Sequence, residues 1–228
     1  MELPHKHPPQ AAWLHQIGPR MLKWWPAKAF GTTTGMIVFF GIYFWLLRHP
    51  LFPYTTVPLT PIDRLIGFWP GALPLYLSLW FYLPLAPALL IDRSELVSYG
   101  FAAVGLSVIG LGIFLFLPTA VPPAEVDWSR HPAFVFLKAA DASGNACPSL
   151  HVAFAVFTAI WFERLLRQMG AGPLVRALNW LWCLGILYST IAIRQHVFLD
   201  VIAGAVLGST VAGVHQQLLR VFPGSEKA

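Results

Sequence analysis

The sequence predicts an all-α protein that spans a membrane, and two observations support this fold class. Hydrophobic residues make up 57% of the 228 residues and charged residues only 11%, whereas a soluble domain carries about 25% charged residues. The apolar residues also gather in stretches of about 17–23 residues, long enough for helices that cross the hydrocarbon core of a bilayer. We therefore expect six transmembrane helices.

Composition also limits the partners that we expect. The formal net charge is +5, but the basic residues are scattered singly between apolar stretches and do not form the stripe typical of nucleic-acid binding. Membrane topology explains them better, so we expect no nucleic acid partner. Cys147 and Cys183 have no metal-ligand spacing. We expect no metal, no cofactor and no obligate protein partner.

The N-terminal third predicts a surface segment followed by two spans. Residues 1–30 are basic and contain several tryptophans and prolines, a pattern typical of a segment that lies on the membrane surface. The first span is expected at about 32–47. A proline-rich connection over 48–68 predicts a loop. The second span, at about 69–91, should be kinked because it contains Pro70, Pro74, Pro84 and Pro87.

The remaining chain predicts four more spans and one long loop. The third span is expected at about 96–117, the fourth at 148–166, the fifth at 177–193 and the sixth at 197–219. The loop over 118–147 is long for a compact domain, and such loops are usually functional. We therefore divide the chain into an interfacial segment (1–30), a six-helix membrane domain (31–220) and a C-terminal tail (221–228).

The distribution of basic residues predicts the orientation. Six crossings place both termini on one side of the membrane, and ten of the 15 Lys and Arg residues would lie on that side. These ten are Lys6, Arg20, Lys23, Lys28, Arg93, Arg164, Arg167, Arg176, Arg220 and Lys227. The positive-inside rule then places both termini in the cytoplasm. The loop over 118–147 and the starts of the fourth and sixth spans would lie on the extracytoplasmic side.

Ionisable residues inside two apolar stretches predict a phosphate site. His196 and Asp200 are four residues apart, so on a helix the carboxylate can accept a hydrogen bond from one ring nitrogen and leave the other basic. His151 follows Pro148 and Ser149 at the start of another apolar stretch, where backbone N–H groups favour an anion. Ionisable groups at such positions are costly and usually face a cavity or a partner.

These residues resemble two signatures of the type 2 phosphatidic acid phosphatase superfamily. Pro148-Ser149-Leu150-His151 resembles the second signature, usually Pro-Ser-Gly-His, in a version that contains Leu. Residues 189–200 resemble the third signature, Ser-Arg-x5-His-x3-Asp, with Ser189, His196 and Asp200 in register. The resemblance implies a helical membrane enzyme of lipid phosphate metabolism, which we expect in a bacterial cytoplasmic membrane.

The sequence departs from the superfamily pattern at the phosphate-binding cations. The Arg of the third signature is replaced by Thr190, and Arg194 could take over its phosphate contact. The first signature, Lys-x6-Arg-Pro, is absent, and its place is taken by a Pro-Thr-x-x-Pro-Pro run over 118–123. This run resembles the subgroup of inositol-phosphorylceramide-synthase-like proteins. Arg130 and Lys138, further along the same loop, are candidates for the missing cations.

The resemblance and the residues together imply a mechanism with two outcomes. His196, oriented by Asp200, would attack phosphorus, and His151 would act as general acid and then as general base. Arg194, Ser149 and one of Arg130 or Lys138 would bind the phosphate oxygens. Water as acceptor gives a lipid phosphatase, whereas an alcohol gives a lipid phosphotransferase.

Several lipids fit the expected site, and a different function class stays open. Phosphatidate, phosphatidylglycerophosphate and polyprenyl diphosphate could each present a phosphate to a site near the lipid headgroups. A transporter or channel that uses the intramembrane His, Arg and Asp residues is the distant alternative.

Overall fold

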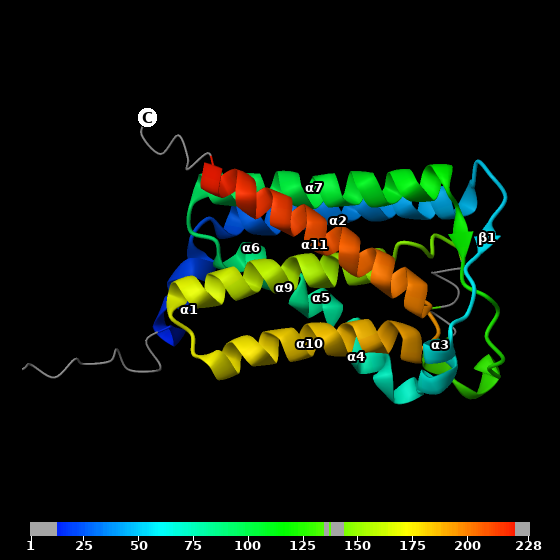
Figure 1. Cartoon of the computed structure of the whole chain (residues 1–228). Coiled ribbons are helices and arrows are strands. Elements are labelled where there is room, and N and C mark those ends of the chain that lie inside the picture. The colour runs from blue at the N-terminus through cyan, green and yellow to red at the C-terminus, as the bar shows by residue number, and fades with distance from the viewer. Residues whose placement is uncertain (1–12, 135–136, 138–143, 222–228) are drawn as a thin grey trace, which may run out of the picture.

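The computed structural model describes residues 13–134, 137 and 144–221, and shows long helices that run along a common axis (Figure 1). The long helices are α2 (Trp25–Arg48), α7 (Arg93–Phe116), α9 (Leu150–Met169), α10 (Pro173–Ala192) and α11 (Phe198–Val221). Helices of 20 to 24 residues are about 30–36 Å long, which matches the thickness of the hydrocarbon core. The predicted all-α fold class is confirmed.

Within the described residues, five helical segments are long and apolar enough to cross a membrane. They are 25–48, 70–89, 93–116, 173–192 and 198–219. α9 is as long as α10, but its C-terminal half carries Glu163, Arg164 and Arg167. The predicted count of six spans is therefore not confirmed, although the apolar helices indicate an integral membrane protein.

The second predicted span is broken into short helical pieces. These are η1 (Pro70–Ala72), α4 (Leu73–Leu77), α5 (Leu79–Tyr82) and α6 (Leu85–Leu89). Each proline lacks an N–H donor and its ring crowds the preceding turn, so a continuous helix cannot form. Ser78 lies at one break, where its hydroxyl donates to the Leu75 carbonyl and accepts from the Trp182 indole of α10. The predicted kink is thus present and is more severe than a single bend.

One end of the bundle carries the N-terminal helix α1 (Leu14–Leu22). Gln16 donates to the Met169 carbonyl at the end of α9, and Arg20 donates to the Leu89 carbonyl at the end of α6. Of the predicted interfacial segment, residues 1–12 lie outside the described residues, and residues 25–30 already belong to α2. That helix begins earlier than expected because Pro26 suits its first turn.

The other end of the bundle is closed by loops that pair with one another. β1 (Thr55–Thr56), after α2, pairs in parallel with β2 (Thr119–Ala120), after α7. Two further short elements, α3 (Pro61–Ile66) and η2 (Trp128–Arg130), lie in the same connections. The starts of α9 and α11 also lie at this end (Figure 1), so both candidate motifs meet there.

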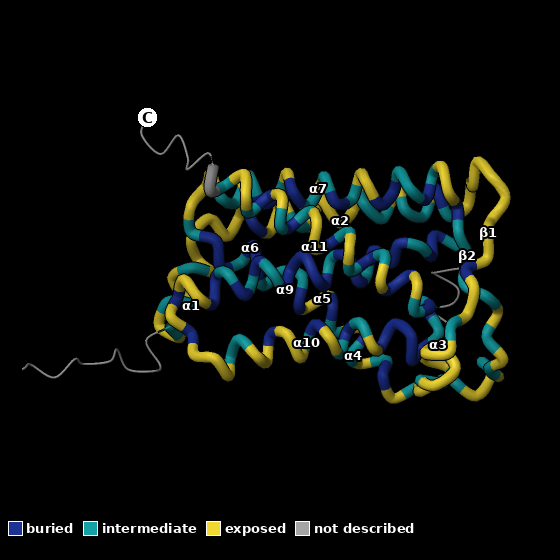
Figure 2. The backbone as a smooth tube through the Cα atoms, in the orientation of Figure 1, coloured by how far each residue is buried: buried dark blue, intermediate teal, exposed yellow. Residues whose placement is uncertain are grey.

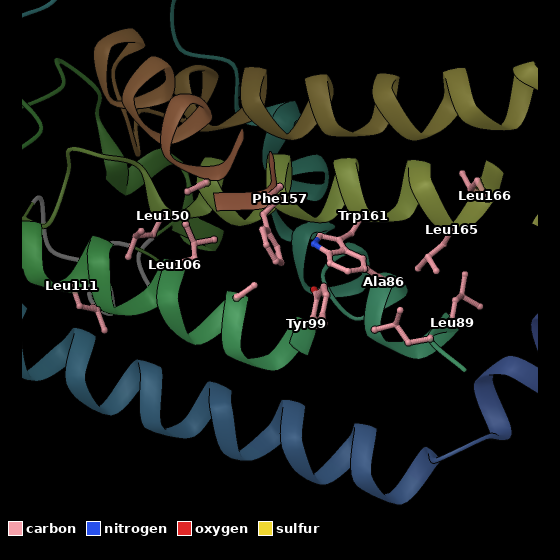
Figure 3. Packing of buried hydrophobic residues seen from close by; sticks show 14 of the residues in the cluster. Ala86, Leu89, Tyr99, Leu106, Leu111, Leu150, Phe157, Trp161, Leu165 and Leu166 are labelled. Carbon is pink, nitrogen blue, oxygen red and sulfur yellow. The ribbon is translucent and has the colours of Figure 1, made fainter. Parts of the chain in front are cut away.

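α9 forms the centre of the core. Of its 20 residues 13 are buried, whereas only 11% of the apolar window of α2 and 22% of that of α7 are buried (Figure 2). Figure 3 shows Phe157 and Trp161 of α9 directed toward Tyr99 of α7, and the ring centroids of Tyr99 lie 5.4 and 5.3 Å from theirs. The exposed faces of the outer helices are apolar, as expected where lipid replaces water.

Two glycines allow α11 to lie directly on the backbone of α9. A Cβ atom at Gly204 would be 2.3 Å from the Ser149 carbonyl oxygen, and one at Gly208 would be 2.2 Å from that of Ala153. The two glycines are four residues apart on one face of the helix, the spacing typical of close helix contacts in membranes. The Ser149 N–H also donates to the Asp200 carbonyl (3.0 Å). The first turns of α9 and α11 are thereby held together.

We expect Gly204→Ala and Gly208→Ala to destabilise the protein because each added methyl group forces α11 away from α9. Overpacking of this kind costs about 1–3 kcal/mol, so the thermal unfolding midpoint of the detergent-purified protein should fall. Gly213→Ala is the matched control on α11, since its Cβ would meet no described atom within 4 Å. Equal midpoints for all three variants would contradict the proposed contact.

Candidate active site

His196 and Asp200 lie side by side, but not on one helix as predicted. α11 begins at Phe198, so His196 belongs to the turn between α10 and α11. Its Nδ1 is 3.5 Å from Oδ2 of Asp200, which is longer than a hydrogen bond; such contacts often tighten only when substrate is bound. Asp200 is fully buried and also accepts a hydrogen bond from the Val197 N–H (2.9 Å).

The turn that carries His196 is held by the end of α10. The Thr190 carbonyl accepts hydrogen bonds from the N–H groups of Gln195 and His196, both at 3.1 Å. Arg194 adopts a left-handed conformation with φ of 59°, which is uncommon for a residue with a Cβ atom. Thr190 occupies the position at which the superfamily signature has Arg, and here its hydroxyl donates to the Leu187 carbonyl. The backbone of Thr190 thus shapes the turn.

His151 lies in the first turn of α9, against aromatic rings of the broken span. Its ring stacks on Tyr76 with centroids 4.1 Å apart and planes inclined by 10°, and it meets the Trp80 ring edge to face with centroids 6.1 Å apart. Among the described residues, no group hydrogen-bonds its buried Nε2. The N–H of Ser149, two residues before His151, donates to the Asp200 carbonyl (3.0 Å). The two predicted motifs are therefore brought together at the starts of α9 and α11.

Ser149 is the N-cap residue of α9. Its hydroxyl oxygen accepts from the Val152 N–H (3.3 Å), and its side chain is fully buried. This satisfies one of the free N–H groups at the helix start. The hydroxyl hydrogen is still available to donate, so capping does not prevent a contact with phosphate.

Arg194 and Asp63 connect the turn to the short helix α3. An Arg194 guanidinium nitrogen donates to the Asp63 carbonyl (3.0 Å). The fully buried Asp63 carboxylate accepts from the Phe198 N–H with Oδ1 and from the N–H and hydroxyl of Thr60 with Oδ2, each at 2.7 Å. Asp63 therefore caps both α3 and α11. A loop was predicted over 48–68, although the Thr60-x-x-Asp63 spacing is typical of a helix start. No sequence signal predicts the contact with α11.

Of the two loop cations predicted to bind phosphate, the structure describes only Arg130. The Arg130 side chain is 81% exposed and pairs with Asp127 at 3.1 Å. Lys138 lies outside the described residues. The same loop nevertheless contributes Phe134, which is 2% exposed and packs in a cluster with Tyr76 and Ile193. The loop thus packs an aromatic ring in the cluster that contains Tyr76, the residue stacked on His151.

Thr119 fixes the segment that precedes Ser149. Its hydroxyl accepts from the Cys147 N–H (2.7 Å) and donates to the Cys147 carbonyl (3.3 Å), while its own carbonyl accepts from the Ala146 N–H (3.2 Å). Thr119 belongs to the Pro-Thr-x-x-Pro-Pro run. That run therefore positions the second motif through backbone contacts.

Cys147 lies beside the carboxylate of Asp200. Burial, and after it the negative charge of Asp200, raises the pKa of the Cys147 thiol to about 11. The thiol is therefore protonated at neutral pH and is a poor nucleophile. Within the described part of the chain, no group of three His, Cys, Asp or Glu side chains is arranged to hold a metal ion.

Comparison with known proteins gives one match. The family model of the PAP2 superfamily matches residues 94–221, which is more than half of the chain. The same comparison finds no curated protein and no solved structure that matches this chain. The matched region contains both histidine motifs. The match to the superfamily does not confirm the resemblance to the inositol-phosphorylceramide-synthase-like subgroup.

We expect alkylation of Cys147 by iodoacetamide to be very slow at pH 7 and to rise about tenfold per pH unit up to about pH 11, because only the thiolate reacts. The rate should be measured in a Cys183→Ala protein, so that one thiol reports. Adding Asp200→Asn should shift the rise to lower pH by removing the nearby charge. A rate that levels off near pH 8 would contradict the environment described.

We expect Asp63→Asn to lower the thermal unfolding midpoint. The Asp63 carboxylate accepts hydrogen bonds from the N–H groups of Thr60 and Phe198, and an amide nitrogen would face one of these donors without accepting from it. An unsatisfied buried N–H costs about 1–3 kcal/mol. Asp92→Asn is the matched control, since Asp92 is exposed at the start of α7 and makes no side-chain cap there. Equal midpoints would mean that Asp63 does not hold the start of α11.

Proposed function

We propose, from the premise that the chain belongs to the PAP2 superfamily, that it is a membrane phosphatase that hydrolyses a lipid phosphate monoester or diphosphate through a phosphohistidine. Membership supports phosphatase or phosphotransferase activity on lipid phosphates in general. One observation carries the more specific proposal. His196 lies beside the buried carboxylate of Asp200, and the Asp200 carbonyl accepts from the N–H of Ser149, two residues before His151.

In the first half-reaction, Nε2 of His196 attacks the phosphorus atom of the substrate. The proton on Nδ1 faces Asp200, which favours the tautomer with a free Nε2 lone pair and stabilises the positive charge that develops on the ring. As the N–P bond forms, the bond from phosphorus to the lipid oxygen breaks. The leaving oxygen takes a proton from Nε2 of His151. The products are a phosphohistidine and a lipid alcohol, or a lipid monophosphate when the substrate is a diphosphate.

In the second half-reaction, water replaces the lipid. His151, now neutral, removes a proton from water as its oxygen attacks phosphorus, and the N–P bond breaks. Inorganic phosphate leaves, and both histidines return to their starting protonation states. Tyr76 supports this role because its stacked ring fixes the plane of His151 between the two steps.

Phosphate oxygens need donors near the two histidines, and Arg194 and Ser149 are the proposed ones. Arg194 lies in the same turn as His196, and a rotation of its guanidinium about the contact with the Asp63 carbonyl could direct further N–H groups to phosphate. Ser149 lies two residues before His151 and retains a hydroxyl hydrogen. Lys138 stays a candidate third cation, whereas the exposed pair with Asp127 makes Arg130 the weaker one.

Transfer to an alcohol acceptor is the second candidate reaction. It uses the same first half-reaction, and an alcohol then takes the place of water. The specific observation in its favour is that Thr119, in the run that resembles the transferase subgroup, fixes the segment next to Ser149. A transporter or channel has no comparable support.

We also propose a bacterial cytoplasmic membrane as the location, with both termini in the cytoplasm and the site outside. The described ends of the chain lie at one end of the bundle, and the two histidine motifs lie at the other (Figure 1). Most of the Lys and Arg residues lie toward the ends of the chain and the short turns on that side, which is typical of a cytoplasmic face.

We expect His196→Ala to abolish phosphate release, and His151→Ala to reduce it by about 10²–10⁴-fold, the usual contribution of a general acid. Asp200→Asn should also reduce the turnover number. The measurement is release of inorganic phosphate by purified protein in detergent from phosphatidate, phosphatidylglycerophosphate and polyprenyl diphosphate. Each lipid is tested with and without an alcohol acceptor and with EDTA.

His49→Ala is the matched control, because His49 is exposed at the end of α2. Unchanged turnover in His196→Ala or His151→Ala would refute the mechanism. Product formed only with an alcohol acceptor would establish the transferase, and loss of activity with EDTA would reveal a metal requirement.

A further inference from the structure

A cavity of about 430 Å³ lies between α9, α10 and α11, at the end of the bundle away from the candidate active site. Its wall includes Arg164 and Arg167 from α9, Trp180 from α10 and Gln216 from α11. Arg164 lies 13 residues after His151, which corresponds to about 20 Å along the helix. The cavity is therefore a separate feature from the site of the proposed reaction.

The helices leave this cavity open to the side. α10 and α11 leave the turn over 193–197 and diverge, and α9 lies between them (Figure 1). Each of the two packs mainly against α9 and hardly against the other. Leu184 of α10 and Leu218 of α11 are exposed apolar side chains on the two diverging helices. A ligand with a polar head and an apolar tail could enter from the membrane.

The charges around the cavity leave an excess of guanidinium groups. Oε1 of Glu163 accepts from Nε of both Arg167 (2.6 Å) and Arg176 (2.7 Å). Arg164 pairs with Glu95 at 2.7 Å. Three guanidinium groups thus meet two carboxylates among the described residues. The local balance favours an anion.

Two buried donors at the cavity have no hydrogen-bond acceptor in the described structure: Nη1 of Arg164 and Nε2 of Gln216. They come from different helices, α9 and α11, and both residues line the cavity. Buried donors are rarely left without an acceptor, because the unsatisfied group is unfavourable. Oε2 of Glu163 likewise has no described donor. The Arg164 guanidinium also lies over the Trp161 ring, with Cζ 4.9 Å from the ring centroid. A ligand with acceptors and at least one donor would satisfy the three atoms that have no described hydrogen-bond partner.

We propose that this cavity binds the phosphate group of a phospholipid headgroup that also carries a hydroxyl or ammonium donor. Phosphate oxygens accept from Arg164 and Gln216, and the headgroup donor faces the free oxygen of Glu163. Basic cavities between transmembrane helices suit such headgroups. The acyl chains lie along the exposed apolar residues beside the opening. Free inorganic phosphate shares the acceptor chemistry but lacks the tail and the organic donor.

The test is a thermal unfolding titration of the purified full chain in detergent with phosphatidylglycerol, a phosphodiester with two headgroup hydroxyls. We expect a saturable rise of the unfolding midpoint. Gln216→Leu should raise the half-saturating concentration about tenfold, the effect of losing a hydrogen bond to a charged group of about 1.4 kcal/mol. Gln217→Leu is the matched control, because Gln217 is the exposed neighbour on α11 and is not part of the cavity wall.

The controls separate this cavity from the active site. His196→Ala should leave the titration unchanged, so the inference stands even if the proposed reaction is wrong. Inorganic phosphate at equal concentration should not shift the unfolding midpoint. If inorganic phosphate does raise the midpoint and Gln216→Leu removes that rise, the cavity binds an anion, and the proposal that its ligand is a lipid is wrong. Absence of any saturable shift, or a shift that Gln216→Leu and Gln217→Leu affect equally, would mean that the cavity holds only water.

Discussion

The contact between α9 and α11 is the constraint on which the rest of the structure depends. His151 begins one helix and His196 precedes the other, so their separation is set by how closely the two backbones approach. Gly204 and Gly208 make that approach possible, since any larger residue would meet carbonyl oxygens of α9. Two residues without side chains thus set how closely the two histidine motifs approach each other.

Two buried carboxylates stabilise the turn with His196 by accepting hydrogen bonds from successive backbone N–H groups. Asp200 accepts from Val197 and Asp63 accepts from Phe198. These contacts use the donors that a helix start would otherwise offer to an anion. The proposed phosphate ligand must then rely on side chains such as Arg194, and on the start of α9. The turn that carries His196 is therefore firmly held, but these two backbone N–H groups are not left to bind an anion.

The fold class, the kinked second span and the pairing of His196 with Asp200 could be predicted from the sequence, because each follows from local composition or spacing. The prediction that both residues share one helix was wrong, because the backbone before Phe198 turns to bond the Thr190 carbonyl. Tyr76 and Asp63 were not predicted at all. Their roles arise from contacts between residues far apart in sequence, and no spacing rule covers such contacts. Arg130 was a candidate only by its position in the loop.

The break in the span over 70–89 has a consequence for how this protein can be divided. Tyr76 and Trp80, whose rings lie against His151, and Asp63, which caps α11, all precede residue 94, where the superfamily match begins. The matched region holds both histidine motifs but lacks these residues that contact them. A fragment cut at that boundary would contain both signatures and still lack part of the candidate site. The N-terminal half is thus an integral part of that site and cannot be treated as a detachable membrane anchor.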